Sequence, residues 1–466
     1  MKKNGKMGAF DLFLFNVVSV FGIAWFTSAA KMGPSQIFLW ILAALLFFIP
    51  ESFIVTELST TWPLEGGLSA WAAEAFGSKT GFLTSWIYLL QNIIYFPAFL
   101  ITAATFFSYF ICKPFLADNK IYMLIFCMIL MWGVTFLNIK GFNISKIINR
   151  FGAVFSFGII SLLIILALYW VFGLHQPVQT HYTLKSMIPD FSNLKSIVFF
   201  STMLFAFAGM EAPASLMSKI ENPKKDFPKA ILLSAIILPF LWIIGTTSLT
   251  IVMSPSKIGL VSGMINVIDV VCKKANIGWF VSIVGLFLFL FRIGSVNVWT
   301  LSPIVMFLGG SKGYMPEWLT KTDEKTGTPK NALIIQAVLV SILTFMSCSM
   351  PTMESAYWLI SAMATICLFI VFLVLFASFI KLRIKEPDVK RGYKVPCGKL
   401  MASVAFCIVF ASTILALLPP DGINVGALIK YEAELIGGPI IFIAIGYIFY
   451  WIYKKKNTSE NKSVQG

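Results

Sequence analysis

Charge is scarce in this chain. Asp, Glu, Lys and Arg make up 12% of the 466 residues, about half the fraction in a typical soluble domain, while 58% of the residues are hydrophobic. This composition excludes an ordinary soluble globular protein. The apolar runs are long and continuous, and they do not alternate with polar residues as the strands of a membrane barrel do. We therefore expect an all-α polytopic membrane protein.

Histidine is nearly absent and cysteine is scattered. The two histidines, His175 and His181, fall in one predicted external loop, and the seven cysteines stand singly, without the paired spacing of a metal site or a disulfide framework. The sequence shows no cluster of nucleophile, base or metal ligands, which a membrane enzyme would need. We therefore expect no metal, no cofactor and no enzymatic activity.

The charge that is present lies mostly on one side of the predicted membrane. The formal net charge is +15, and most Lys and Arg residues fall in the amino end, in every second loop and in the carboxyl tail. This bias predicts that both termini are cytoplasmic, so the basicity does not indicate nucleic acid binding. The Gly-rich stretch 309–313 lacks the spacing of a phosphate-binding loop, and we expect no nucleotide site.

Twelve apolar segments are each about 20 residues long, which is the length that crosses a bilayer as a helix. They are 9–30, 36–57, 81–112, 121–138, 147–172, 196–218, 229–253, 277–303, 332–350, 355–380, 399–418 and 435–453. We expect a single transmembrane domain over 1–453, followed by a short basic and polar cytoplasmic tail, 454–466.

Two of these segments are interrupted at corresponding positions in the two halves of the chain. Ser19 and Gly22 interrupt the first, while Gly209, Glu211 and Pro213 interrupt the sixth. Breaks in corresponding helices are typical of transporters built from inverted repeats, which bind their substrate at mid-membrane between the half-helices. The alternative is a pair of kinked packing helices. The predicted repeats cover about 9–172 and about 196–380, with two further helices over about 399–453.

Four motifs follow one another along the chain. They are Glu57-Leu58-Ser59 with Pro63, Gly66-Gly67 and Trp71; Gly209-Met210-Glu211-Ala212 with Glu221-x-Pro223 and Asp226-Phe227-Pro228; Pro387 to Pro396; and Leu418-Pro419-Pro420-Asp421. Together they resemble the amino acid–polyamine–organocation superfamily and, within it, the bacterial glutamate/GABA antiporters, over essentially the whole chain. The resemblance implies a LeuT-like fold of twelve helices, with a five-plus-five inverted repeat, broken helices 1 and 6, and two C-terminal helices.

The broken helices and the resemblance point to a substrate site. We expect the backbone freed at the two breaks to hold the α-carboxylate and α-amino groups of an amino acid, because helix N-termini attract anions and C-termini attract cations. The expected substrate-binding residues are Ser19, Val20, Phe21, Gly22, Ile23, Gln91, Phe205, Ala206, Gly209, Met210, Arg292 and Phe369. Glu211 is the candidate for proton coupling or gating, because burial of a carboxyl favours its protonated form.

Four positions in the spans carry open interpretations. Arg292, the only cation in a span core, either clamps a substrate carboxylate or pairs with Glu211 or another protein acid. Gln91 either lines the pathway or makes an interhelical hydrogen bond. Phe369 stands where the antiporter family tends to have a tyrosine, so a hydroxyl is missing there. Glu51 is an acid that is not expected in the family, and we expect a neighbouring cation to pair with it.

The function that these features predict is secondary active transport. We expect a proton-linked antiporter of glutamate/GABA type that exchanges an amino acid for a counter-substrate by alternating access within the lipid bilayer. The alternative is a proton- or sodium-coupled carrier of another amino acid or amine, with Ser295 or Ser302 as a sodium ligand. A channel is a further alternative, and it would move its substrate without requiring a counter-substrate on the other side of the membrane. The sequence leaves both a monomer and a homodimer open.

Overall fold

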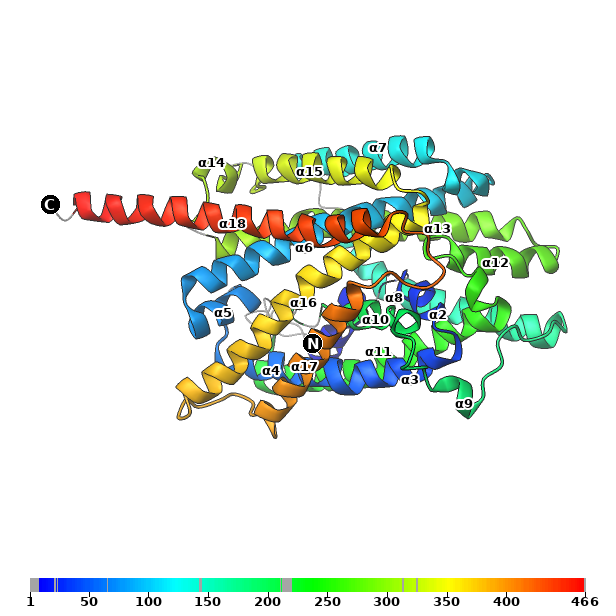
Figure 1. Ribbon diagram of the computed structural model, residues 1–466, viewed down its shortest axis with the longest axis horizontal. Coiled ribbons are helices and arrows are strands. Elements are labelled where there is room, and N and C mark those ends of the chain that lie inside the picture. Colours follow the sequence, from blue (N-terminus) through cyan, green and yellow to red (C-terminus); the bar gives the residue numbers. More distant parts are fainter. Residues whose placement is uncertain are drawn as a thin grey trace.

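The structure is a computed structural model that describes residues 8–20, 22, 24–64, 66–141, 145–209, 211, 220–311, 314–323 and 326–464. Within these ranges the regular secondary structure is helical, without a strand (Figure 1). The prediction of an all-α protein is confirmed for this part of the chain.

Long helices form the body of the molecule. They are α6 (Ser78–Phe110), α7 (Lys120–Ile139), α8 (Ser145–Leu168), α11 (Pro223–Val252), α13 (Phe280–Gly310), α15 (Lys330–Cys348), α16 (Met353–Lys385), α17 (Gly398–Ala416) and α18 (Leu428–Val464). The shorter helices are α1 (Ala9–Val20), α2 (Ala24–Ala30), α3 (Gln36–Ala43), α4 (Ile49–Thr61), α5 (Leu68–Phe76), α9 (Leu184–Met187), α10 (Phe200–Ala206), α12 (Gly263–Lys274) and α14 (Glu317–Thr320). A π-helical turn, η2 (Ala44–Phe48), joins α3 to α4 without an interruption.

Nine helical segments in the described ranges are long and apolar enough to cross a membrane. They cover 33–61, 78–110, 120–139, 225–252, 280–308, 330–348, 353–385, 398–416 and 428–453. Each overlaps one of the predicted spans. The first predicted span contains a break, while the fifth and sixth include residues whose side chains or backbone lie outside the description, so the number twelve stays a prediction.

The outer surface carries the side chains expected of a lipid-facing surface. On α7, Ile121, Ile125 and Ile129 are 71%, 55% and 69% exposed, and their spacing of four places them on one side of the helix. On α15, Ile342 and Phe345 are also exposed. Continuous apolar surfaces of this kind are rare on soluble monomers, and on a membrane protein they contact the hydrocarbon chains of the lipids. The surface therefore agrees with a multi-pass membrane protein.

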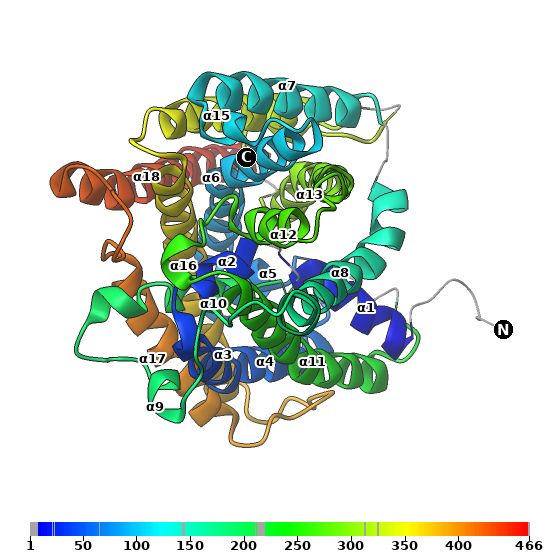
Figure 2. The same ribbon diagram turned by 90° about the vertical axis from the view of Figure 1, so that its right-hand side faces the viewer.

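The helices are arranged in layers around α6. Helix α6 packs against α13 and α16, and α7 and α15 lie side by side as an outer layer (Figure 2). Helices α6 and α16 are the most buried of the candidate spans. Residues that face inward on α6 can therefore contact several other helices at once.

Two short helices, α5 and α12, lie at opposite ends of the molecule (Figure 1). Helix α5 follows the second predicted span and α12 follows the seventh. In an inverted repeat, corresponding connections fall on opposite sides of the membrane. This placement supports the inverted repeat, which is itself still a prediction.

The predicted end of the eighth span comes before the end of the corresponding helix, α13. The sequence predicts an end at residue 303, whereas α13 continues to Gly310 and contains Pro303 in its interior. A proline inside a membrane-protein helix is tolerated where neighbouring groups satisfy the freed backbone. The Gly-rich stretch 309–313 therefore begins in a helix terminus and not in an open loop.

Candidate functional site

The first break separates α1 from α2. Helix α1 ends at Val20, α2 begins at Ala24, and Gly22 lies between them outside regular structure. A Cβ atom on Gly22 would lie 2.4 Å from the indole nitrogen of Trp25, so a larger residue would collide there. Three predicted site elements, Phe21, Ile23 and the side chain of Ser19, lie outside the described residues.

The second break follows α10. This helix ends at Ala206, and Gly209 has a φ of 117°, a conformation that favours glycine. Glu211 comes two residues later and is 2% exposed. Met210 and residues 212–219 lie outside the described part of the chain. The glycine thus allows the chain to leave the helix and places a carboxylate in the interior.

Two donors hold the Glu211 carboxyl group. The Tyr88 hydroxyl of α6 donates to Oε1 at 3.2 Å, and the backbone N–H of Gly209 donates to Oε2 at 2.8 Å. The first contact links the second break to α6, and the second closes the turn at the break. Glu211 therefore connects the position of the broken segment to the central helix.

Aromatic side chains join the two breaks to α6. The rings of Trp25, Tyr95 and Phe205 lie against one another, with centroid distances of 5.6 Å for Trp25–Tyr95, 4.9 Å for Trp25–Phe205 and 5.3 Å for Tyr95–Phe205. These residues belong to α2, α6 and α10. Pairs of this geometry each add about 0.5–1.5 kcal/mol beyond area burial. Of the predicted residues, Phe205 is thus brought into the cluster.

Arg292 of α13 borders this aromatic cluster. It is 3% exposed, and its guanidinium lies over the ring of Phe99, 5.4 Å from the centroid. Its Nε and Nη2 atoms have no hydrogen-bond partner in the described part of the chain. A buried guanidinium with unused N–H groups has the donors that an anion requires, since Arg matches the planar geometry of a carboxylate.

Two tyrosines complete the surroundings of Arg292. The hydroxyls of Tyr95 and Tyr357, from α6 and α16, lie 3.2 Å apart, and Arg292 interacts electrostatically with both phenols. The alternative in which Arg292 pairs with Glu211 is not what the structure has, because Glu211 is held by Tyr88 and Gly209. The hydroxyls and the guanidinium together form a polar group beside the aromatic cluster.

One face of α6 connects the Glu211 end of the site to the Arg292 end. Tyr88, Gln91, Tyr95 and Phe99 are spaced by three or four residues, so they lie on one side of the helix. Seven residues separate Tyr88 from Tyr95, which is about 10 Å along the axis. Gln91 is buried between them on the same face, and its place in the substrate pathway stays a prediction.

Phe369 does not join this group. It is fully buried in α16, twelve residues after Tyr357, which places it about 18 Å farther along the helix axis. The tyrosine of α16 that does contact the site, Tyr357, escaped the sequence analysis, which considered Phe369 at this helix. Tyr357 lies about three turns before Phe369, near the start of α16. A single tyrosine in this apolar segment did not indicate a binding site.

The interpretation that a neighbouring cation pairs with Glu51 finds no such cation among the described residues. Glu51 lies in α4, is 0% exposed, and has no hydrogen-bond partner for either carboxyl oxygen among the described residues. The charged group with which it interacts is another acid, Glu211. Glu57 lies six positions after Glu51 on the same helix, and the sequence could not show which of the two acids binds the arginines at the end of α16 and in the loop after it.

Those cations bind Glu57. Its carboxyl accepts hydrogen bonds from Arg383 Nε at 2.7 Å, from Arg383 Nη2, and from the backbone N–H of Val395 at 2.7 Å, and Arg391 Nε lies 3.0 Å from Oε1. Glu57 is 0% exposed. Burial and the Glu57 charge raise the pKa of the nearby Tyr393 phenol. We call Glu57, Arg383, Arg391 and the Val395 amide the clasp.

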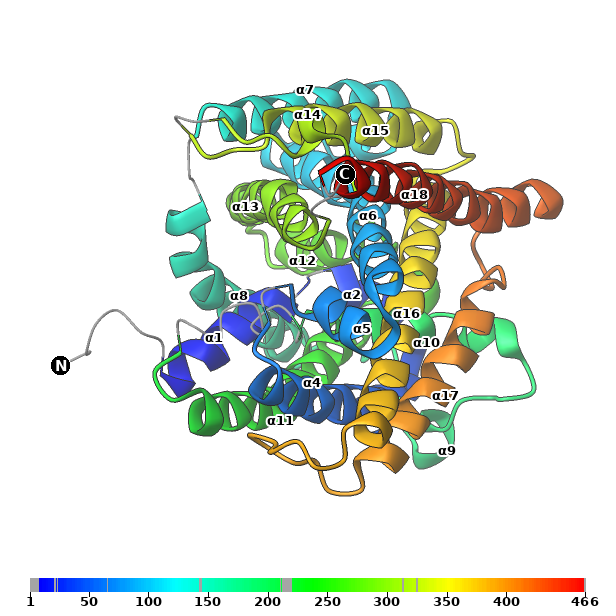
Figure 3. The same cartoon turned by 90° about the vertical axis from the view of Figure 1, so that its left-hand side faces the viewer.

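The clasp brings two of the sequence motifs together. Glu57 belongs to the first motif and Arg391 to the loop between α16 and α17, which lies at the lower edge of Figure 3. A Cβ atom on Gly392 would lie 2.6 Å from the Thr60 carbonyl oxygen, so the loop approaches α4 closely. The motifs are separated by more than 300 residues in sequence and are one contact in space.

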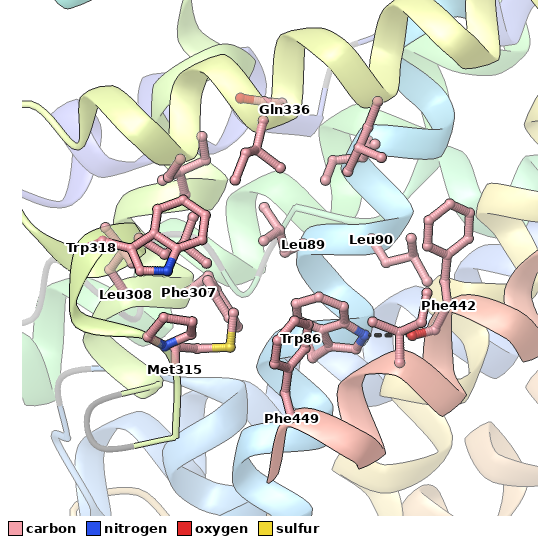
Figure 4. A pocket seen from close by; sticks show the side chains of 18 residues that line it. Trp86, Leu89, Leu90, Phe307, Leu308, Met315, Trp318, Gln336, Phe442 and Phe449 are labelled. Atoms are coloured by element: carbon pink, nitrogen blue, oxygen red, sulfur yellow. Dashed lines mark hydrogen bonds between the residues drawn. The ribbon is translucent and has the colours of Figure 1, made fainter. Parts of the chain in front are cut away.

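A separate cavity of about 230 Å³ lies between α6, α13, α15 and α18, with α14 beside it (Figure 4). Apart from Gln336, its lining is mostly apolar, and the Trp86 indole N–H that borders it already donates to the Phe442 carbonyl at 2.8 Å. The cavity shares no residue with the contacts of Glu211 or Arg292. The charged groups of an amino acid would find few partners there, so it is not the substrate site.

The apolar surface and the buried polar groups beside two helix breaks define a membrane transporter. The family model for amino acid permeases matches residues 7–446. The chain belongs to this amino acid permease family, within the amino acid–polyamine–organocation superfamily, which confirms the resemblance seen in the sequence. Its members are transporters and not enzymes.

Individual relatives align along their whole length. An uncharacterized transporter of Legionella pneumophila is 31% identical over 462 residues, covering 97% of this chain and 97% of its own. A glutamate/gamma-aminobutyrate antiporter and a probable agmatine/putrescine antiporter, both of Lactococcus lactis, are each 25% identical over 97% of this chain, covering 91% and 96% of their own lengths. The first relative is named for an acidic amino acid and a zwitterion, and the second for two cationic amines.

The clasp predicts a large loss of stability when its acid is removed. Glu57→Gln leaves two arginines without their charge partner, and breaking a buried pair in this way costs about 3–5 kcal/mol. We expect a clear fall in the unfolding temperature of the detergent-purified protein. The control is Asp269→Asn, which breaks a surface pair with Lys273 worth about 0.3–0.5 kcal/mol. Equal melting of the two variants would show that the clasp does not hold the loop.

Proposed function

We propose that this protein is a proton-linked amino acid antiporter of glutamate/GABA type. The observation that carries the proposal is Arg292, a buried guanidinium with unused N–H groups. It faces the aromatic cluster that joins the two helix breaks. An anionic group on the substrate would satisfy these donors, while the backbone freed at the breaks would hold the α-amino and α-carboxylate groups.

The charge of the site favours an acidic amino acid over a polyamine. A cationic substrate would approach an uncompensated guanidinium in a low-dielectric interior, where like charges repel strongly. A substrate carboxylate would instead form two parallel hydrogen bonds with the same group. Of the two named Lactococcus lactis relatives, the glutamate/gamma-aminobutyrate antiporter is therefore the better guide to substrate class.

The alternative is a proton- or sodium-coupled carrier of another amino acid. Of the two serines considered as sodium ligands, Ser295 donates its hydroxyl to the Phe291 carbonyl of its own helix at 3.3 Å, and the side chain of Ser302 lies outside the described residues. The hydroxyl oxygen of Ser295 could still accept a cation. Omitting sodium from a flux assay separates the two functions.

Exchange in proteoliposomes tests the proposal directly. Vesicles loaded in turn with glutamate, glutamine, GABA, arginine and a neutral amino acid are supplied with external radiolabelled glutamate, in acid and at neutral pH. We expect uptake that requires an internal partner, rises in acid and does not need sodium. Absence of glutamate uptake with every loading would contradict the glutamate specificity and redirect the assay to other amino acids and amines.

Arg292→Ala should discriminate between substrates. Loss of a charge-assisted pair worth about 1.5–3 kcal/mol lowers kcat/KM for glutamate by about 10- to 100-fold, while a neutral amino acid changes much less. Arg292→Lys keeps the charge without the fork of donors, so it should retain part of the activity. An equal loss for acidic and neutral substrates, together with poor folding, would assign Arg292 a structural role.

Glu211→Gln should flatten the dependence of transport on pH. The amide keeps the size of the side chain, and its oxygen can accept from the Gly209 N–H while its NH2 group donates to the Tyr88 hydroxyl, but it cannot bind or release a proton. We expect exchange between equal pH values to persist, with similar rates in acid and at neutral pH. Tyr88→Phe is the matched control, since it removes a hydrogen bond and leaves the carboxyl group. A wild-type pH profile in Glu211→Gln would remove Glu211 from proton coupling.

A further inference from the structure

Glu51 is a buried acid to which the proposed substrate site assigns no role. It is fully buried in α4, and neither carboxyl oxygen has a hydrogen-bond partner among the described residues. It follows Pro50 and the π-helical turn η2, at a point where the regular hydrogen bonding of the helix changes. Turns of this kind inside helices occur frequently at functional sites.

Among the described residues, no positive charge compensates Glu51. Helix α4 packs against η2, α11, α16 and α17, and the charged residues of these three helices in the described ranges lie in their first two or last two turns. Arg383 of α16 is already bound by Glu57. The titratable groups that interact with Glu51 are Glu211 and Tyr88. A second acid is therefore its main electrostatic neighbour.

Burial and this neighbour act in the same direction. A carboxylate without hydrogen bonds is strongly disfavoured in a low-dielectric interior, and a second carboxylate nearby disfavours its charge further. Glu211, by contrast, accepts two hydrogen bonds, which stabilise an ionised carboxylate. The two hydrogen bonds of Glu211, and the lack of any at Glu51 among the described residues, favour placing a shared proton on Glu51.

We propose that Glu51 is a proton-binding site of this transporter, neutral in the conformation described here and electrostatically coupled to Glu211. The proposal rests on the proposed function and adds the group that carries the proton. The proton binds a Glu51 carboxylate oxygen from water when the interior is open to the acidic side, and it returns to water on the other side. No other bond forms or breaks.

The contacts of Glu211 connect this proton to the movement of the substrate site. When Glu51 loses its proton, its negative charge repels Glu211, which is tied to the second helix break through Gly209 and to α6 through Tyr88. Repulsion at this point favours a conformation in which the two acids are separated or hydrated. The same face of α6 continues to Tyr95 and Phe99, which border Arg292.

Glu51→Gln tests the proposal, because the amide copies the neutral acid without its exchangeable proton. We expect glutamate exchange between equal pH values to continue, the ratio of rates in acid and at neutral pH to fall to about one, and accumulation driven by a pH gradient to be lost. Glu51→Asp, which keeps the carboxyl group, should retain a pH response. Ser52→Ala is the matched control, because Ser52 is a buried neighbour on α4 whose hydroxyl has no hydrogen-bond partner within the described ranges. An unchanged pH ratio and gradient response in Glu51→Gln would overturn the proposal.

Infrared spectroscopy gives a second measurement that needs no substrate. The wild-type minus Glu51→Gln difference spectrum at neutral pH should contain the carbonyl stretch of a protonated carboxylic acid, and the wild-type minus Ser52→Ala spectrum should not. If the wild-type protein exchanged none of the offered amino acids, the proposed function would fail while this band still decided the protonation of Glu51. A difference spectrum with a carboxylate band and no acid band would overturn the proposal.

Discussion

The constraint that organises this molecule is the high free energy of an isolated charge in hydrocarbon. Three buried ionisable groups satisfy it in different ways. Glu57 has two arginines and a backbone amide as partners, which locks a loop onto the bundle. Arg292 lies against Phe99 and has no anionic partner among the described residues, which is why we propose that a substrate supplies one. Glu51 has no cation and no hydrogen bond in the described ranges, which is why we propose that it is protonated.

Helix α6 relates these groups to the two breaks in the helices. Its inward face contacts Glu211 through Tyr88 and the first break through the stacking of Tyr95 on Trp25. Phe205, from the segment before the second break, contacts the same two aromatic rings. A displacement of either broken segment must therefore change contacts on one rigid helix. This arrangement gives a physical route by which substrate binding and protonation can influence each other.

The fold and the selectivity of this family are separable. Relatives of the same length and organisation are named as antiporters of glutamate and gamma-aminobutyrate or of agmatine and putrescine. Backbone groups at helix breaks recognise features that all amino acids share, whereas a side chain such as Arg292 distinguishes substrates by charge. The proposed specificity depends on this single cation and its tyrosine neighbours, and not on the family as a whole.

The sequence by itself determined the helical membrane architecture, the family, the position of the first break and the isolation of Arg292, because hydrophobic runs, glycines and a lone cation are local properties. The tertiary structure decided which groups meet. It showed that Arg383 binds Glu57 and not Glu51. It also showed that Tyr357 rather than Phe369 approaches Arg292, and that Glu51 interacts with Glu211. These contacts join residues that lie far apart in the chain, and no periodicity or spacing within one helix specifies the partner on another.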